Sequence, residues 1–175
     1  LIDATNGQRE AEWEGRRVLL INADWGELAI SLQGAQVLHF LPFAPEAAGA
    51  QPAPGMEDGW LWVTPTPQPM PGAIRGGIPL CWPWFADENT ADESPDRSGP
   101  MHGPARKADW QLDAVDEHED GVEVHLSLPQ RLHSQLHPRA VVQANAQRLH
   151  VELITEHLGE TPVKMTAALH SYLAV

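Results

Sequence analysis

The chain contains a single cysteine, Cys81, and this scarcity excludes two kinds of structure. One thiol cannot form an internal disulfide, and it cannot build a zinc site from several thiolates. Cys81 lies in an apolar run without a basic neighbour in sequence, so we expect a buried side chain rather than a nucleophile. A chain without disulfides is also typical of a reducing compartment.

Long apolar runs are missing as well. A helix that spans a bilayer needs about 20 consecutive apolar residues, and no segment approaches that length. The first residues show no basic cluster followed by an apolar stretch, which a secretion signal would need. We therefore predict a soluble, cytoplasmic protein that does not contact membranes.

Positive charge is scarce too. There are 11 Lys and Arg residues against 24 Asp and Glu residues, which gives a formal net charge of -13. Nucleic-acid binding needs a basic surface that this composition does not provide. An anionic small molecule is not excluded, because a few arginines in one pocket can reverse the potential locally.

A helical apolar period is absent over any useful length, and alternation with a period of two takes its place. The predicted strands cover residues 18–21, 27–32, 35–40, 60–63, 110–115, 122–128, 140–144, 149–156 and 163–175. Tight turns join many of them, so the sequence predicts an all-β, antiparallel protein.

The remaining segments are predicted to be irregular. Residues 1–16 should form an irregular leading segment, and residues 42–59 an exposed loop. Residues 64–71 contain four prolines and cannot form a central strand, so we expect an extended crossing that leads to Arg75. The acidic residues 87–99 should form a mobile flap.

The chemistry concentrates in residues 74–106. This stretch begins with Arg75 and a glycine pair and ends with His102 and Arg106, an arrangement that predicts a pocket. The aromatic run between them has two readings, a wall for the apolar face of a ligand or part of the core. Its members are Trp82, Trp84 and Phe85.

Three motifs in this order resemble those of the glucose-6-phosphate 1-epimerases, the hexose-6-phosphate mutarotase branch of the aldose 1-epimerase family. They are RGGIPLCWPWF at residues 75–85, HGPAR at residues 102–106 and LHSY at residues 169–172. The resemblance covers nearly the whole chain and implies an antiparallel β-sandwich of galactose-mutarotase type. We expect residues 1–175 to form one such domain, truncated at its C-terminus, because relatives are usually much longer.

The resemblance also implies roles for individual residues and a reaction without metal or cofactor. Mutarotation opens and recloses a sugar ring, which needs one acid and one base. The resemblance makes His170 the catalytic acid and His102 a second catalytic histidine, and it places the base, a glutamate, beyond Val175. The substrate-binding residues that it implies are Arg75, Arg106, Trp82 and Tyr172.

Two departures from relatives concern the ligand more than the fold. Pro104 stands where many relatives have Phe, which alters the wall beside Arg106. Met101 stands where relatives have a glutamine that contacts the ligand, and a thioether cannot donate that hydrogen bond. The identity of the sugar and the need for its phosphate stay open.

Simpler interpretations exist for most of these residues. A strand histidine such as His170 often bonds a backbone carbonyl, His102 can cap a turn, and the two arginines can pair with Asp87, Glu88 or Asp109. His133 and His137 have a spacing seen in zinc sites, but Pro138 disfavours the helix that such a site needs, and we predict no metal.

Two alternatives concern the protein as a whole. A carbohydrate-binding module that has lost its base would keep the same pocket without catalysis. Open sheet edges, in turn, can pair with a second copy of the chain, so self-association is a further expectation.

Overall fold

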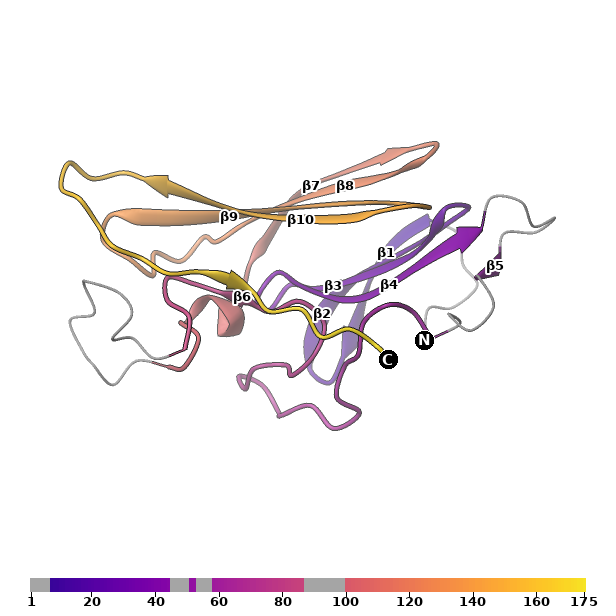
Figure 1. Ribbon diagram of the computed structural model, residues 1–175, viewed down its shortest axis with the longest axis horizontal. Helices are drawn as coiled ribbons and strands as arrows, with labels where there is room; N and C mark the ends of the chain where they lie inside the picture. Colours follow the sequence, from indigo (N-terminus) through magenta and orange to yellow (C-terminus); the bar gives the residue numbers. More distant parts are fainter. Residues whose placement is uncertain (1–6, 45–50, 53–57, 87–99) are drawn as a thin grey trace.

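The computed structural model describes residues 7–44, 51–52, 58–86 and 100–175, and two antiparallel sheets face each other in it (Figure 1). The first sheet has the order β1-β2-β3-β4-β5, the second has the order β10-β9-β8-β7, and β6 pairs with β11 separately. In the first sheet the strands are β1 (Gly7–Trp13), β2 (Arg16–Ala23), β3 (Gly26–Ser31), β4 (Gln36–Ala44) and β5 (Gln51–Pro52). In the second they are β7 (Gln111–His118), β8 (Gly121–Ser127), β9 (Leu136–Asn145) and β10 (Leu149–His157).

Strand β6 (Leu80–Cys81) and strand β11 (Ala168–Leu169) form a short ladder beside the sandwich. The one helical element that the structure describes with its bounds is the 3-10 turn η2 (Ala105–Lys107). All the pairings are antiparallel, which confirms the predicted fold class. Within the described residues, no helix is long and apolar enough to cross a membrane.

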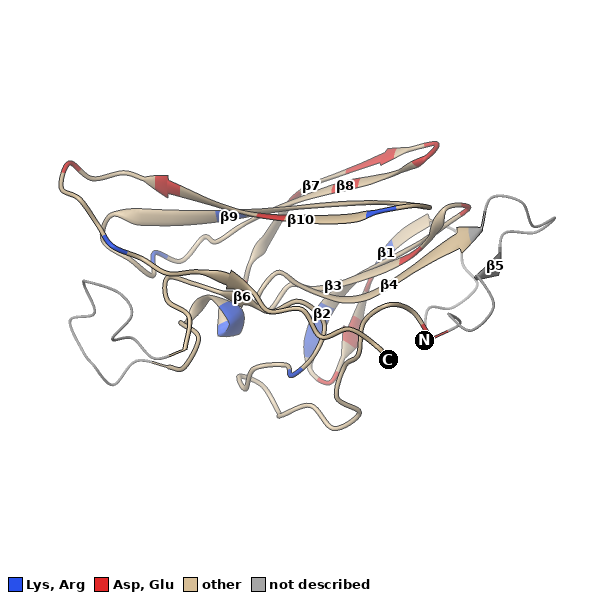
Figure 2. Cartoon of the chain, viewed as in Figure 1, with Lys and Arg blue, Asp and Glu red and all other residues tan. Residues whose placement is uncertain are grey.

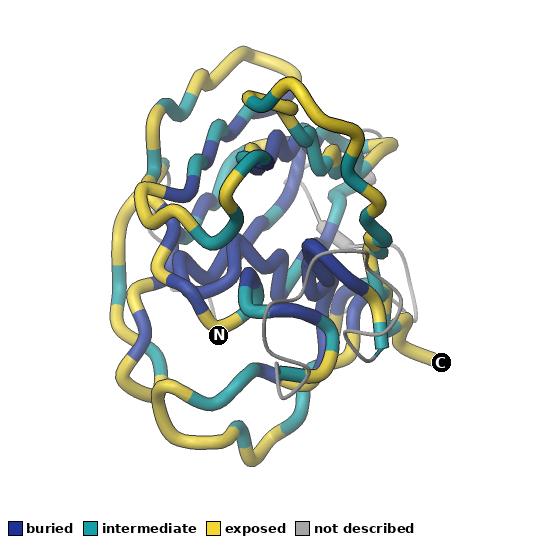
Figure 3. Tube along the Cα trace, turned by 90° about the vertical axis from the view of Figure 1, so that its left-hand side faces the viewer, coloured by how far each residue is buried: buried dark blue, intermediate teal, exposed yellow. Residues whose placement is uncertain are grey.

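Alternate side chains of the facing strands build one core between the two sheets. Ile21 and Leu28 of the first sheet belong to the same buried cluster as Val124 and Val142 of the second, and each is 0% exposed. Burying one such side chain contributes about 1.5 to 3 kcal/mol. The buried part of the chain therefore runs through the middle of the molecule, with exposed turns around it (Figure 3).

Two segments differ from the sequence-based expectation. Residues 7–13, expected to be irregular, form strand β1. This strand lies at the edge of its sheet and is mostly exposed, so it lacks the apolar alternation that marks a half-buried strand. Residues 163–175, expected to be one strand, pair as a ladder only at Ala168 and Leu169. The rest of this segment is attached to other segments by single backbone hydrogen bonds. Such isolated bonds do not require alternating apolar residues, so the sequence pattern cannot distinguish them from a strand.

The expected strand over residues 60–63 is reduced to isolated bridges, at Leu61 with Leu173 and at Val63 with Gly76. The crossing at residues 64–71 contains no strand, as its prolines predict. Strand β4 extends to Ala44 and pairs with β5, inside the segment expected to be a loop. The flap expected at residues 87–99 lies outside the described residues.

A buried arginine holds the proline-rich crossing against the first sheet. Arg16 is 1% exposed and donates through Nη2 to the backbone carbonyls of Gln68, at 2.6 Å, and Gly72, at 2.8 Å. Its Nε donates to Gln33 Oε1 at 2.7 Å, and Gln33 Nε2 donates to the carbonyls of Pro71 and Gly72, both at 3.1 Å. A buried cation is tolerated when its donors are satisfied, as most of them are here.

Glycines allow the central segment, the described residues 74–86 and 100–106, to lie directly on neighbouring backbone. Gly77 has φ 59° and lies against β4, where a Cβ would overlap the carbonyl oxygen of Val37. Gly103 has φ 75°, and a Cβ there would overlap the carbonyl oxygen of Trp82. Any other residue would have to move these two backbones apart.

Substituting Gly103 by Ala tests how much stability depends on this approach. Gly15 is a matched control, since its φ of 76° is nearly the same and its nearest potential contact is Met70 Cγ at 3.7 Å. Both substitutions add a left-handed alanine, which costs about 1 to 2 kcal/mol. G103A should cost about 1 to 3 kcal/mol more, because the crowded backbone must shift. Urea unfolding of both variants measures the difference, and equal unfolding free energies would contradict the role of close approach.

Candidate functional site

A cavity of 470 Å³ opens where the proline-rich crossing, the central segment, η2 and the C-terminal segment meet. We call it the basic cavity. Its polar lining side chains come from all four of these segments: Thr64, Thr66, Gln68, Arg75, His102, Arg106, Lys107, His170 and Tyr172. Five of the six site residues predicted from sequence therefore share one cavity, although they lie up to about a hundred positions apart in the chain.

Arg75 is held in place through the backbone on either side of it. The buried Gln36 donates through Nε2 to the carbonyl of Ile74, at 3.1 Å, and to that of Gly76, at 2.6 Å. The carbonyl of Arg75 itself accepts from the backbone N–H of Thr64 at 2.9 Å. The backbone of Arg75 is thus fixed, while its exposed guanidinium forms no ion pair with any described residue. Of its expected partners, Asp87 and Glu88 lie outside the described residues.

Arg106 is placed by the turn η2. Ala105, the first residue of this turn, is fully buried, and its carbonyl accepts from Trp110 Nε1 at 2.9 Å. The guanidinium donates through Nη2 to the carbonyl of Met101 at 2.9 Å. Its Nε is buried without a hydrogen-bond partner among the described residues. Arg106 therefore retains donors for a further acceptor in the basic cavity.

His102 exchanges two hydrogen bonds with Ala86. The backbone N–H of Ala86 donates to His102 Nδ1 at 3.0 Å, and the backbone N–H of His102 donates to the carbonyl of Ala86 at 2.6 Å. An acceptor at Nδ1 requires the neutral ring to carry its proton on Nε2. Burial lowers the pKa of His102, and the charges of Arg106 and His170 lower it further. His102 is thus kept as a neutral donor through Nε2.

The rings at the basic cavity form a continuous row. The centroid of His170 lies 4.8 Å from that of Tyr172 and 5.8 Å from that of His102. Phe85 stacks on His102 at 4.9 Å, and Trp62 lies 6.0 Å from Tyr172. Aromatic neighbours at these separations restrict the orientation of each ring. The row presents both imidazoles beside one another.

Backbone hydrogen bonds to the central segment set the position of this row. The N–H of His170 donates to the carbonyl of Pro79 at 3.1 Å, and the N–H of Tyr172 donates to that of Gly77 at 2.9 Å. The backbone of His170 is therefore satisfied without its ring. No described residue forms a hydrogen bond with its imidazole. The simpler interpretation, in which the ring bonds a backbone carbonyl, therefore does not apply within the described residues.

Trp82 is the predicted site residue that does not line the basic cavity. Its side chain is 0% exposed in the core, and Nε1 donates to Thr155 Oγ1 at 3.0 Å. This placement corrects the role expected from the resemblance, since a fully buried indole cannot touch a ligand. Trp84 is also buried, and its Nε1 donates to the carbonyl of Pro100 at 2.9 Å. Of the three aromatic residues in this run, only Phe85 is exposed, at 37%.

Lys107 is a lining residue that the sequence analysis did not select. It directly follows Arg106 on η2, so its position immediately after the HGPAR motif was the available signal. Together with the two arginines it makes three cations, and no described Asp or Glu lines the cavity. Figure 2 shows the basic turn η2 separated from the acidic residues of β7 and β8. An anionic ligand fits this charge pattern.

Cys81 behaves as its sequence context predicts. It is buried, and burial raises the pKa of its thiol, although the charge of Arg106 acts in the opposite direction. A thiol whose pKa is raised is a poor nucleophile. Cys81 thus belongs to the floor of the basic cavity rather than to its chemistry.

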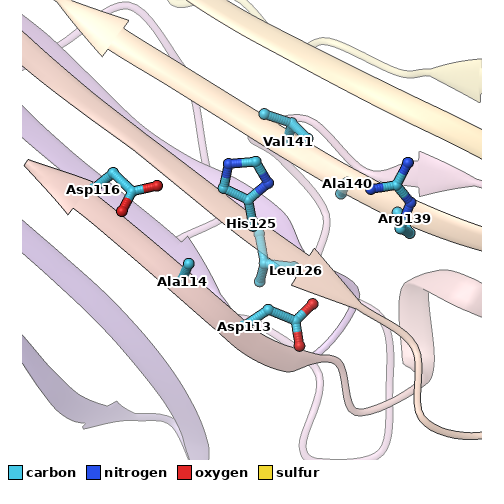
Figure 4. A pocket seen from close by; sticks show the side chains of 8 residues that line it. All are labelled: Asp113, Ala114, Asp116, His125, Leu126, Arg139, Ala140 and Val141. Carbon is cyan, nitrogen blue, oxygen red and sulfur yellow. The ribbon is translucent and has the colours of Figure 1, made fainter.

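A second hollow of 310 Å³ lies on the outer face of β7, β8 and β9 (Figure 4). Asp116, Glu123 and His125 bring one potential metal-ligating atom each within 4.8 Å of one another there. Both oxygens of Glu123 are already used, since His125 Nε2 lies 2.6 Å from one and Gln143 Nε2 lies 2.6 Å from the other. Glu123, His125 and Gln143 therefore form a hydrogen-bonded surface network in which the carboxylate is already engaged.

The two histidines with zinc-like spacing are engaged locally. His133 Nδ1 accepts from the backbone N–H groups of Gln135, at 3.0 Å, and Leu136, at 3.1 Å. His137 Nε2 lies 2.8 Å from the carbonyl of Leu128, on the neighbouring segment. Each ring thus bonds a different piece of backbone.

Comparisons with known proteins are consistent with this geometry. The family model described as aldose 1-epimerase matches residues 16–175. A relative from Escherichia coli strain K12, named "Putative glucose-6-phosphate 1-epimerase", is 30% identical over 151 residues, which are 84% of this chain and 45% of that protein. A protein of the same name from Salmonella typhimurium is 34% identical over 95 residues, covering 54% of this chain and 26% of its own length.

One solved structure shares the fold over the whole chain. It is described as "a putative mutarotase (YeaD) from Salmonella typhimurium", with a TM-score of 0.76 and 26% identity, and the match covers 100% of this chain and 54% of that one. The chain thus spans about half the length of the relatives to which it is similar.

The neutral state of His102 leads to a prediction about its titration. Its imidazole should take up a proton at a pH below the ordinary value of 6.5, and the proton of the neutral ring should be on Nε2. Substituting Arg106 by Gln removes one opposing charge and should move the midpoint upward. NMR titration of the ring nitrogens measures both, and a wild-type midpoint at or above 6.5 would contradict the burial argument.

The same shift affects folding. The unfolded histidine takes up its proton near pH 6.5 while the folded one resists it, so stability falls as the pH drops below that value.

Proposed function

The chain belongs to the aldose 1-epimerase family, and we propose that its basic cavity binds a hexose 6-phosphate and helps to interconvert the α and β anomers. The observation that carries this proposal is the convergence of two arginines with two neighbouring histidines on one cavity. In their names, relatives of this chain refer to glucose 6-phosphate and to mutarotation. The shared cavity supports carrying that activity over to the protein that contains this chain.

The reaction requires a proton to enter on one side of the sugar and to leave on the other. An acid protonates the ring oxygen while a base removes the proton of the anomeric hydroxyl, so the bond from C1 to the ring oxygen breaks and C1 becomes a carbonyl. Rotation about the C1–C2 bond and reversal of these transfers give the other anomer. No electron is transferred, so the reaction needs no redox cofactor.

We assign the acid to His170. Its ring lies among the cavity-lining rings, and its backbone is satisfied by Pro79, so the imidazole is available for chemistry. A histidine suits this role because its ordinary pKa lies close to neutral pH. His102, which is neutral and protonated on Nε2, serves as a fixed hydrogen-bond donor to a sugar oxygen.

The base is assigned to a glutamate of the protein outside this chain. No described carboxylate lines the basic cavity, while the relatives are about twice as long as the matched region. On this proposal, the chain supplies the acid and the phosphate-binding groups, and another part of the same protein supplies the carboxylate.

Arg75 and Arg106 are proposed to bind the phosphate. A guanidinium offers a planar fork of N–H groups that matches two phosphate oxygens. Arg75 has a fixed backbone and an exposed head, and Arg106 has a buried Nε without a partner among the described residues. Two such groups in an acidic chain make the cavity selective for an anion.

The second candidate is a sugar-binding protein without turnover. The lack of a described carboxylate at the basic cavity is the observation that favours it. Both candidates predict binding of a sugar phosphate, so only exchange between anomers separates them.

Exchange spectroscopy by NMR on the full-length protein tests the catalytic proposal. H170A should slow the exchange of glucose 6-phosphate anomers by about 100- to 10,000-fold, the usual contribution of a general acid. H150A is the matched control, because His150 pairs with Glu152 on the surface of β10, and it should leave the rate unchanged. Unchanged exchange in H170A would reject the assignment, and a wild type that does not accelerate exchange above the spontaneous rate would favour the binding protein.

Calorimetry tests the assignment of the phosphate site. R75Q should weaken binding of glucose 6-phosphate by roughly 10- to 100-fold, because a hydrogen bond to a charged group contributes about 1.5 to 3 kcal/mol. Binding of unphosphorylated glucose should not change. R148Q removes an exposed arginine between β9 and β10 and is the matched control. An equal effect of R75Q on both sugars would mean that Arg75 does not contact the phosphate.

A further inference from the structure

The basic cavity contains a third cation in addition to the two arginines that are proposed to bind the phosphate. Lys107 lines it together with Arg75 and Arg106, in a chain that has only 11 Lys and Arg residues against 24 Asp and Glu residues. Three cations without a described acidic neighbour in the lining form a local reversal of the overall charge. The two arginines alone do not account for this concentration of positive charge, so Lys107 needs a role of its own.

The side chains of Arg106 and Lys107 leave the turn η2 in different directions, and both line the basic cavity. The N–H of Lys107 donates to the carbonyl of Pro104 at 3.1 Å, and that of Ala108 donates to Ala105 at 3.3 Å, which closes the turn. A 3-10 turn has three residues per turn, so consecutive side chains point about 120° apart. Both side chains nevertheless line the basic cavity, so they approach a ligand there from two directions.

Packing holds the backbone around Lys107 in place, whereas the Lys107 side chain extends into solvent. Ala105 is buried at the base of the turn, and the Arg106 backbone lies against Gly34, where a Cβ would come within 2.6 Å of the Arg106 carbonyl oxygen. The Lys107 side chain is exposed, and within the described part of the chain its ammonium forms no ion pair. An ammonium on a flexible stem complements the fixed forks of two arginines.

We propose that Lys107 is the third cation of the phosphate subsite and sets the preference for phosphorylated over unphosphorylated sugars. This inference rests on the proposed function and extends it. A phosphate monoester carries about -1.5 to -2 charges at pH 7 and has three terminal oxygens. Two arginines leave room for one more donor, and a compact ammonium supplies it. An unphosphorylated sugar offers no charge at that point.

The simpler interpretation is a solvated lysine that happens to border the cavity. It predicts no effect of Lys107 on either sugar, or the same small effect on both through general disturbance of η2. The proposal predicts that only the phosphorylated sugar is affected. A comparison of two sugars that differ in the phosphate alone therefore separates the two interpretations.

The test measures kcat and KM of the full-length protein for glucose 6-phosphate and for glucose. K107Q should raise KM for glucose 6-phosphate by about 3- to 10-fold, a moderate value because the ammonium is exposed to solvent. Its kcat and both constants for glucose should stay unchanged, and K107R should restore most of the affinity. Lys164 is the only other lysine, so K164Q is the matched control.

Three outcomes decide the inference. An increase in KM confined to the phosphorylated sugar supports it, and an equal change for both sugars, or none, overturns it. If the wild type does not accelerate anomer exchange above the spontaneous rate, the proposed catalysis fails on its own. Calorimetric binding of glucose 6-phosphate then still decides the role of Lys107, because K107Q must bind it more weakly than K164Q does.

Discussion

The basic cavity depends on how closely the central segment approaches the backbones around it. Gly77 lies against the carbonyl oxygen of Val37 on β4, and Gly103 lies against that of Trp82. The first contact presses the stretch after Arg75 onto the first sheet, and the second brings His102 beside the aromatic run. A side chain at either glycine would separate these backbones and move the functional groups carried next to them.

Buried amides and a buried guanidinium then fix what the glycines bring together. Gln36 holds the carbonyls on both sides of Arg75, and Arg16 with Gln33 holds those of the proline-rich crossing. Apolar packing could not do this, because an irregular segment leaves carbonyls without strand partners, and such carbonyls need hydrogen-bond donors when they are buried. These hydrogen bonds hold the irregular backbone beside the sheets in a defined position, as a ladder holds a strand. Its side chains can therefore line a cavity.

Electrostatics in this protein work locally rather than across the whole molecule. The chain is strongly acidic, yet three cations gather at one cavity that no described carboxylate lines. Salt screens interactions between exposed charges beyond about 8 to 10 Å, and Figure 2 shows the acidic residues of β7 and β8 apart from η2. One of these cations helps to keep His102 neutral, since burial lowers the pKa of His102 and the charge of Arg106 lowers it further. A histidine that donates without carrying a charge and cations that attract an anion are thus parts of one arrangement.

Sequence alone determined the fold class, most of the strands and the set of residues worth examining. Alternating residues mark half-buried strands such as β8, because a strand places successive side chains on opposite faces. The motifs named Arg75, His102, Arg106, His170 and Tyr172, which line one cavity. Tertiary structure alone decided that β1 is a strand, that Trp82 belongs to the core, and that Gln36 holds Arg75. Those outcomes depend on contacts between distant segments, and a local pattern does not record which backbone will lie beside a given side chain.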